Sequence, residues 1–298
     1  MTAARHLRFL VMLCCLGLVA NCSKEPDIDS TPASPESPDG QSGPLAYQES
    51  VNAVMDQMKL RMAYQEDGQR KTMQGLVTMS KERFATVVHS TSQMKRIHLR
   101  RWARLHTAEI TDSEIPRANR TQESPLTDAR LEADKLPGDQ WRFRLTDKPE
   151  TPENVTALKE LEKVESAYTQ FYHGHRVREG ESWQVPAPAI ARWFGDEVAE
   201  MIGSINLKVT GSETIENHAC AVIDVELNTT GKMTDDEGKI SDLELIAKGK
   251  IWRAVDFQED LKVEITGNVK LTAIIPDDSA EVIISGPIAI TESRRIKK

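Results

Sequence analysis

The segments "HACAVIDVELNTT" (His218–Thr230) and "DLELIAKGKIWRAVDF" (Asp242–Phe257) decide the fold class of this chain. In both segments apolar residues alternate with polar ones, and Val and Ile recur, as is typical of β-strands with one buried face. Three further segments share the pattern, Asn206–Ile215, Leu261–Ile275 and Ala280–Glu292, and Gly, Asn and Asp turns separate them. We therefore expect the C-terminal third to be an antiparallel meander in which neighbours in sequence pair.

Two helices are expected before this meander. Thr151-Pro152-Glu153 has the pattern of a helix start, with Thr as the N-cap and Pro at the first helical position. Apolar residues at helical spacing carry this helix to about Tyr172. A second helix is predicted to begin at Pro186–Pro188 and to end at Gly203. The predicted fold class is α+β and β-rich, a curved antiparallel sheet with two or three helices packed on it.

The first part of the globular region has a mixed pattern. Residues from Tyr47 to Leu105 predict three or four strands, and helical spacing of apolar residues from Val51 to Met58 predicts one short helical piece. Thr111–Pro149 is polar and broken by prolines, so we expect an irregular excursion with one short strand at Gln140–Thr146.

The N-terminus has the pattern of an export signal. Arg5 and Arg8 precede the apolar run Phe9–Ala20, which is too short to span a bilayer as a helix and fits the hydrophobic core of a signal peptide. The stretch Ser23–Pro44 is rich in Pro, Ser and Asp and predicts a disordered tether. The expected organisation is a signal peptide over 1–21, a tether over 22–44, and a β-rich globular region over 45–298. Its parts 45–149 and 150–298 are expected to be halves of one domain.

The end of the apolar run resembles the signal of bacterial lipoproteins, in which a box of small residues directly precedes a cysteine. Here the box is Val19-Ala20-Asn21 and the cysteine is Cys22, with Asn21 standing where the family usually has Gly, Ala or Ser. The resemblance implies cleavage after Asn21 and a diacylglycerol on the Cys22 thiol, and hence palmitate-type acyl chains that hold the protein on a membrane lipid layer. Ser23 is not the Asp associated with inner-membrane retention, which favours the outer membrane of the cell envelope. The alternative is an ordinary secretory signal cut near Ala20.

A second resemblance concerns Gly180-Glu181-Ser182-Trp183, which precedes the β-rich part. The segment is similar to one found in uncharacterised secreted proteins of planctomycete-type bacteria, and this resemblance implies no activity. The expected layout also invites comparison, at the level of fold alone, with half-barrel lipoprotein carriers of the bacterial envelope.

The sequence carries no recognisable catalytic motif. There is no G-x-S-x-G elbow, no H-E-x-x-H helix and no Gly-rich phosphate loop. His173 and His175 form an H-x-H pair without a third ligand at a recognisable spacing, and the acidic clusters Asp235–Glu237 and Asp277–Asp278 look like turns. No catalytic residue, metal site or cofactor is predicted. The net charge of -8 and the export signal argue against nucleic acid as a partner.

A few residues have two interpretations. Trp183, Trp193 and Phe194 either line a ligand cleft or seat a helix on the sheet as core residues. The stretch Lys95–Arg104 has five basic residues and is either a solvated strand face or a surface for an anionic headgroup or polysaccharide. Cys220 is expected to be a buried strand thiol.

These observations predict a lipid-anchored envelope protein that binds or presents something at the membrane without catalysis. The expected partners are membrane lipid, through acylated Cys22, and an apolar or anionic envelope ligand. The alternatives are an exported enzyme whose site is assembled from distant residues and a purely structural envelope protein. A pocket with convergent polar groups would favour the enzyme, an apolar cavity the binding protein, and a solid core the structural protein.

Overall fold

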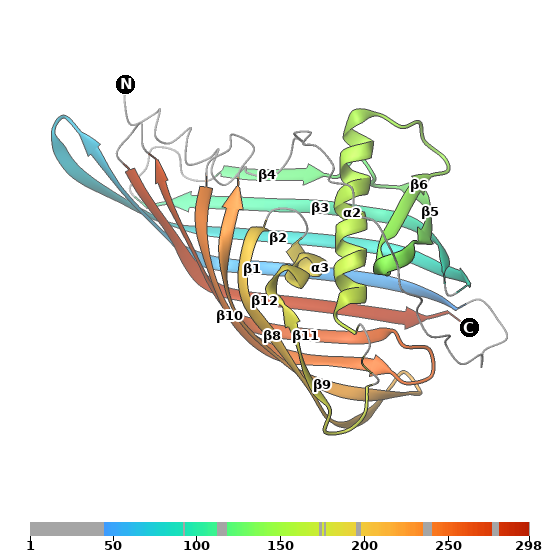
Figure 1. Cartoon of the computed structure of the whole chain (residues 1–298). Helices are drawn as coiled ribbons and strands as arrows, with labels where there is room; N and C mark the ends of the chain where they lie inside the picture. Colours follow the sequence, from blue (N-terminus) through green and yellow to red (C-terminus); the bar gives the residue numbers. More distant parts are fainter. Residues whose placement is uncertain are drawn as a thin grey trace.

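A computed structural model describes residues 45–91, 93–111, 118–172, 175, 177–194, 198–234, 240–275 and 280–297. In these ranges twelve strands form one antiparallel sheet, which curls around the helices α2 and α3 on its inner side (Figure 1). The strands are β1 (Ala46–Glu66), β2 (Gln69–Thr91), β3 (Met94–Ile110), β4 (Ala118–Glu123), β5 (Ala129–Lys135), β6 (Trp141–Leu145), β7 (Ser182–Pro186), β8 (Val198–Ile215), β9 (His218–Thr234), β10 (Ile240–Ala254), β11 (Asp260–Ile275) and β12 (Ala280–Ile296). The helical elements are η1 (Pro137–Asp139), α2 (Pro152–Gln170), η2 (Ala187–Ile190) and α3 (Ala191–Phe194).

The strand order is β6-β5-β3-β2-β1-β12-β11-β10-β9-β8-β7, and β4 pairs with β3 beside β5. Strands β7 to β12 are consecutive neighbours, which confirms the predicted meander. The first and last long strands then pair with each other, for example Tyr47 of β1 opposite Ile296 of β12. Through this pairing, strands from 45–149 and from 150–298 belong to a single sheet.

Tight turns and one irregularity set the register of the long strands. Asp67-Gly68 joins β1 to β2 with positive φ at both residues, as a two-residue hairpin turn requires. In the middle of β1, the pairing with β2 shifts between Met55 and Met58, and Gln57 has a φ of 48°. This bulge keeps the apolar side chains on the inner face, because residues 47, 49, 51 and 53 point inward before it and residues 58, 60 and 62 after it.

Close approach of β10 and β11 requires glycine on the inner face. A Cβ at Gly267 would lie 2.5 Å from Cα of Ala247, and a Cβ at Gly249 would lie 2.5 Å from Cα of Ile265. No side chain fits at these distances, so the curvature of the sheet at this point depends on glycine at both positions.

Helix α2 confirms the helix predicted from Thr151. The Thr151 hydroxyl accepts a hydrogen bond from the backbone N–H of Asn154, and Pro152 is the first helical residue. The helix ends at Gln170, two residues before the predicted end.

Three expectations were wrong in detail. The helical piece at Val51–Met58 is part of the strand β1, because the bulge interrupts the alternation and imitates helical spacing. The second helix is only η2 and α3, and it ends at Phe194 rather than Gly203, since residues from Val198 belong to β8. Thr111–Pro149 is not mainly irregular: besides the expected strand β6 it contains β4 and β5, both of which pair with β3.

Candidate functional site

The inner face of the sheet divides into a part under α2 and a part away from it. Helix α2 has 19 residues, about 28 Å of length, and runs across the strands (Figure 1). A strand of 23 residues such as β2 extends roughly 75 Å. A helix about 10 Å wide that crosses such strands covers only one band of their length.

Beyond this band most inward side chains are apolar, with His106 opposite Met79 and Thr229 opposite Leu245 as polar neighbours, and we call the apolar region the distal inner face. It consists of Met58, Leu60 and Met62 of β1, Met73, Val77 and Met79 of β2, Leu243 and Leu245 of β10, Val269 and Leu271 of β11, and Val282 and Ile284 of β12. Ala53 pairs with Lys81, whose ammonium group contacts Glu160 of α2, and Leu60 lies seven residues further along β1. That separation is roughly 20 Å, so α2 does not reach the part of the distal inner face around Leu60, whereas Met79 lies only two residues from Lys81.

Methionine is concentrated on this side of β1 and β2. Five of the ten methionines of the chain pack in or against the apolar cluster there: Met55, Met58, Met62, Met73 and Met79. Met58 and Met62 are buried, whereas Met73, Met79 and Leu271 are only partly buried. Four of the twelve residues of the distal inner face are therefore unbranched, adaptable methionines. Met73, Met79 and Leu271 reach the surface, and the other nine residues are at most 5% exposed.

A buried network of charges lies on the inner face at the C-terminal part of α2, where the Tyr168 hydroxyl contacts Glu259 and Arg294. We call it the Asp260 network; its charged members are Glu49, Arg83, Arg192, Arg253, Glu259, Asp260, Glu292 and Arg294. Asp260 is 0% exposed and accepts hydrogen bonds from Arg192 at 2.9 Å and from Arg253 at 2.8 Å. The hydroxyl of Tyr172 also donates to it, at 2.8 Å.

Arginines outweigh burial in setting the ionisation of this network. Burial alone would raise the pKa of Asp260, but the adjacent guanidinium groups of Arg253 and Arg192 hold this pKa below its ordinary value. Burial acts in the same way on Glu49, and Arg83 and Arg294 nevertheless lower its pKa to about 2. Both carboxyl groups are thus ionised and paired at neutral pH, which is the pattern of a structural network.

Helix α2 is held by two further ion pairs beside its apolar contacts. Glu165 pairs with Lys95, and Glu160 accepts from Lys81 at 2.7 Å and from Arg104 at 2.9 Å. In both glutamates burial favours the neutral acid, and the neighbouring cations override it and lower the pKa.

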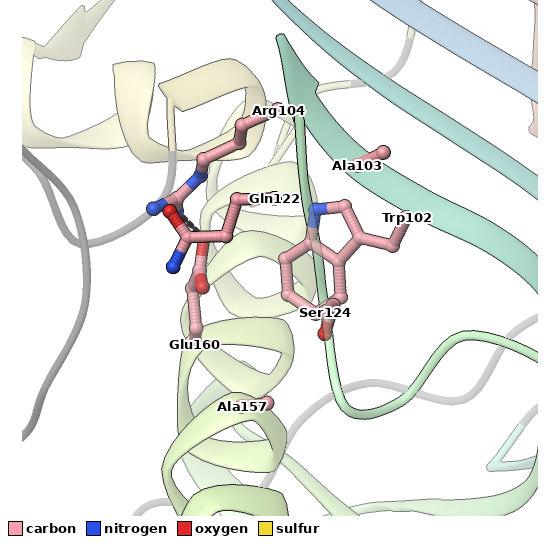
Figure 2. Close-up of a pocket in the computed structure, with 7 residues that line it drawn as sticks. All are labelled: Trp102, Ala103, Arg104, Gln122, Ser124, Ala157 and Glu160. Atoms are coloured by element: carbon pink, nitrogen blue, oxygen red, sulfur yellow. Dashed lines mark hydrogen bonds and ion pairs between the residues drawn. The ribbon is translucent and has the colours of Figure 1, made fainter. Parts of the chain in front are cut away.

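A small pocket lies beside the Arg104–Glu160 pair, between β3, β4 and α2 (Figure 2). Its walls are Trp102, Ala103, Arg104, Gln122, Ser124, Ala157 and Glu160. Figure 2 shows the Trp102 ring and the ion pair on opposite sides of it. Its volume of about 10 Å³ is room for no more than one water molecule, so it is not a site for a metabolite.

The three aromatic residues singled out in the sequence occupy different environments. Trp183 is buried on β7, and its indole N–H donates to the backbone oxygen of Phe171 at 2.8 Å. Trp193 is 2% exposed and packs edge-on against Phe171, with 5.3 Å between ring centroids. Phe194 is partly buried, and its carbonyl accepts from Lys81. All three pack in or against the large apolar cluster, which agrees with the core interpretation.

Of the remaining candidates, those within the described residues have partners in the fold. His175 pairs with Glu181 and stacks on Trp183, while His173 and both acidic clusters lie outside the described residues. Of the basic stretch, Lys95 and Arg104 are buried in ion pairs under α2, so the stretch is not simply a solvated face. Cys220 is a buried strand thiol, as predicted.

The described residues contain neither a metal-ligand cluster nor a membrane-spanning helix. Within the ranges given above, no group of three or more His, Cys, Asp or Glu side chains is placed to hold a metal ion. No helix in those ranges combines the length and apolar character needed to cross a bilayer.

Sequence reasoning missed the Asp260 network, although a signal was present. Glu49, Arg253, Glu292 and Arg294 occupy inward positions in the same alternation as buried apolar neighbours such as Ile290. A charge that continues the apolar phase of a strand indicates a buried partner.

The sequence matches no protein-family model and no curated protein. Among solved structures, the chain has a likeness to lipovitellin, in a structure concerned with lipid–protein interactions, with a TM-score of 0.43 and 11% identity. The likeness covers 86% of this chain and 26% of that one, so the chain spans about a quarter of the length of lipovitellin. A DUF1329 family protein from Desulfovibrio piger is similar over 78% of this chain and 82% of its own, with a TM-score of 0.13 and 9% identity. Both TM-scores are below 0.5.

Proposed function

We propose that this protein is a non-enzymatic, lipid-anchored protein of the bacterial cell envelope that binds the hydrocarbon chain of a lipid on its distal inner face. The observation that carries the proposal is the apolar, methionine-rich stretch of sheet that α2 does not reach. Burial of each CH₂ group of a ligand there would contribute about 0.8 kcal/mol before the costs of binding.

The tether predicted from the sequence has little apolar character to place on this surface. The tether Ser23–Pro44 contains Ile28 as its single large apolar residue. A segment of this composition gains little from contact with an apolar face. An external hydrocarbon chain is the occupant that matches the chemistry of the distal inner face, and membrane lipid is its source at the site of anchoring.

An enzymatic role has less support. On the inner face, the carboxylates with shifted pKa values are Glu49, Glu160, Glu165 and Asp260, and all four are paired with cations and are buried or partly buried. A general acid or base must instead be within reach of a substrate. These groups therefore support a role in positioning α2 and α3 on the sheet.

Binding of a hydrocarbon that has no polar headgroup is the direct test of the proposal. Pyrene-labelled hexadecane is titrated into the full chain and into two variants of β11, Leu271→Glu and Ile274→Glu. Leu271 points inward on the distal inner face, whereas Ile274 points outward and is 70% exposed. We expect wild type and Ile274→Glu to bind alike, and Leu271→Glu to bind at least tenfold more weakly, because it places a carboxylate among apolar groups.

A second matched pair of variants, on β2, keeps the test valid if one of the β11 variants does not fold. Met73 is partly buried on the inner side, and Leu76, three residues later, points outward and is 44% exposed. Met73→Glu should weaken binding of the hydrocarbon and Leu76→Glu should not. Absence of binding by the wild type, or equal binding by the inward and outward variants that fold, would overturn the proposed function.

The anchor is tested separately. If Cys22 is acylated, the intact mass of the protein extracted from its membrane will include acyl chains on a chain that begins at Cys22. The Cys22→Ser variant should then be released by a wash that leaves wild type in the membrane, since two or more chains are needed for stable anchoring. An unmodified mature chain cut near Ala20 would show that the protein is secreted freely.

A further inference from the structure

The α3 helix lies on the inner side of the sheet, at the border between the band under α2 and the region with no described helix (Figure 1). Two neighbouring residues of α3 are more than nine-tenths buried and have an N–H group without an acceptor, at Nε1 of Trp193 and Nη1 of Arg192. Buried donors in proteins are nearly always paired, so unpaired donors at one place need an explanation.

A third unpaired donor belongs to the same cluster. Nε of Arg253 is buried without a partner, and Arg253 and Arg192 share the carboxylate of Asp260. The rings around these donors are close, because the Arg192 guanidinium lies 4.8 Å from the centroid of Trp193 and 4.8 Å from that of Phe171. Because all three unpaired atoms are donors, the missing partner is an acceptor group.

The charge of the cluster indicates which acceptor fits. The Asp260 network contains four guanidinium groups, on Arg83, Arg192, Arg253 and Arg294, and four carboxylates, on Glu49, Glu259, Asp260 and Glu292. Its formal charges balance, so an added anion would be buried without a counter-charge, at a high cost. A neutral oxygen acceptor adds hydrogen bonds without adding charge.

We propose that the indole N–H of Trp193 binds the ester carbonyl of an uncharged lipid whose hydrocarbon chain lies on the distal inner face. This inference rests on the proposed function and names the chemical class of its ligand: an acyl ester rather than a free fatty acid. Trp193 belongs to the same apolar cluster as the distal inner face. Arg192 and Arg253 keep their ion pairs and position α3.

The test compares probes that differ only in the headgroup. Pyrene-labelled hexadecane, the methyl ester of pyrene-labelled hexadecanoate and the free acid are titrated into the full chain at pH 7. The Trp193→Phe variant keeps an aromatic ring and loses the N–H. We expect it to bind the ester about 2- to 12-fold more weakly than wild type does, as for one lost neutral hydrogen bond, and to bind the hydrocarbon unchanged.

Trp183→Phe is the matched control, because the N–H of Trp183 already has a backbone acceptor. This variant should change stability but not the ratio of ester to hydrocarbon affinity. For wild type, the ester should bind more tightly than the free acid. An unchanged ratio in Trp193→Phe would mean that a buried water is the partner of the indole and would overturn the inference. Tighter binding of the free acid than of the ester by wild type would also overturn the inference. Failure of all three probes to bind wild type would instead overturn the proposed function itself.

Discussion

Replacement of Asp260 by Asn should strongly destabilise the fold. The side chain is 0% exposed and forms ion pairs with Arg192 and Arg253, which are themselves buried. Asn is nearly the same size, but it leaves these guanidinium groups without their shared charge. Removal of one partner from a buried ion pair costs about 3–5 kcal/mol. With a urea m-value of about 3 kcal/mol per M, the midpoint of unfolding should fall by about 1 to 1.7 M.

Urea unfolding followed by tryptophan fluorescence and circular dichroism measures this shift. Asp224→Asn is the matched control, because Asp224 pairs with Lys250 on the exposed outer face and its loss should cost no more than about 1 kcal/mol. The pKa of Asp260 is lowered in the folded state, so its carboxylate stabilises the fold above the unfolded pKa of about 3.9. This contribution is lost as pH falls through the folded pKa, and Asp260→Asn should lose less stability on acidification than wild type. Equal midpoints for the two variants would refute the assignment of Asp260 as the centre of the network.

Three further predictions concern single positions. Gly267→Ala should lower the free energy of unfolding by about 1–3 kcal/mol, because its Cβ meets the backbone of β10. Gly211 has open space around it, so Gly211→Ala should be neutral or slightly stabilising. Equal effects of the two variants in thermal unfolding would contradict the close approach of β10 and β11. Thr151→Ala removes the N-cap of α2 and should cost about 1 kcal/mol in urea unfolding, with Thr151→Ser as the control that retains the cap; no difference between them would argue against the cap. Burial lowers the pKa of His106 to about 4, so its ring should stay neutral well below pH 6.5 in an NMR titration, and a midpoint near 6.5 would show that the ring is solvated.

Local patterns predicted the parts of the fold that depend on local chemistry. The alternation from Asn206 to Glu292 identified the meander, and the Thr151 cap with Pro152 located α2 to within two residues at its end. The bulge at Gln57 could not be recognised, because an interrupted strand and a short helix space their apolar residues alike. The short strands β4 and β5 were missed since their partner β3 supplies the pairing that makes them strands.

The candidate site was less accessible to sequence reasoning. The pairing of β1 with β12 joins residues more than 200 positions apart, and it brings Glu49 to Arg294. No spacing in the sequence encodes that contact. The aromatic residues Trp183 and Trp193 look alike in sequence, yet only one has a backbone acceptor for its N–H. That difference arises from tertiary packing and is visible only in three dimensions.

Photo-crosslinking tests the central claim most directly. The full chain is incubated with hexadecane that carries a diazirine, irradiated and digested, and the labelled peptides are sequenced by mass spectrometry. Binding on the distal inner face predicts label on inward residues of β1, β2 and β11, such as Met58, Met73 and Leu271, and none on the outward Ile274. Label confined to outward residues, or no label above that on an unrelated protein, would contradict the claim that the curved sheet binds hydrocarbon.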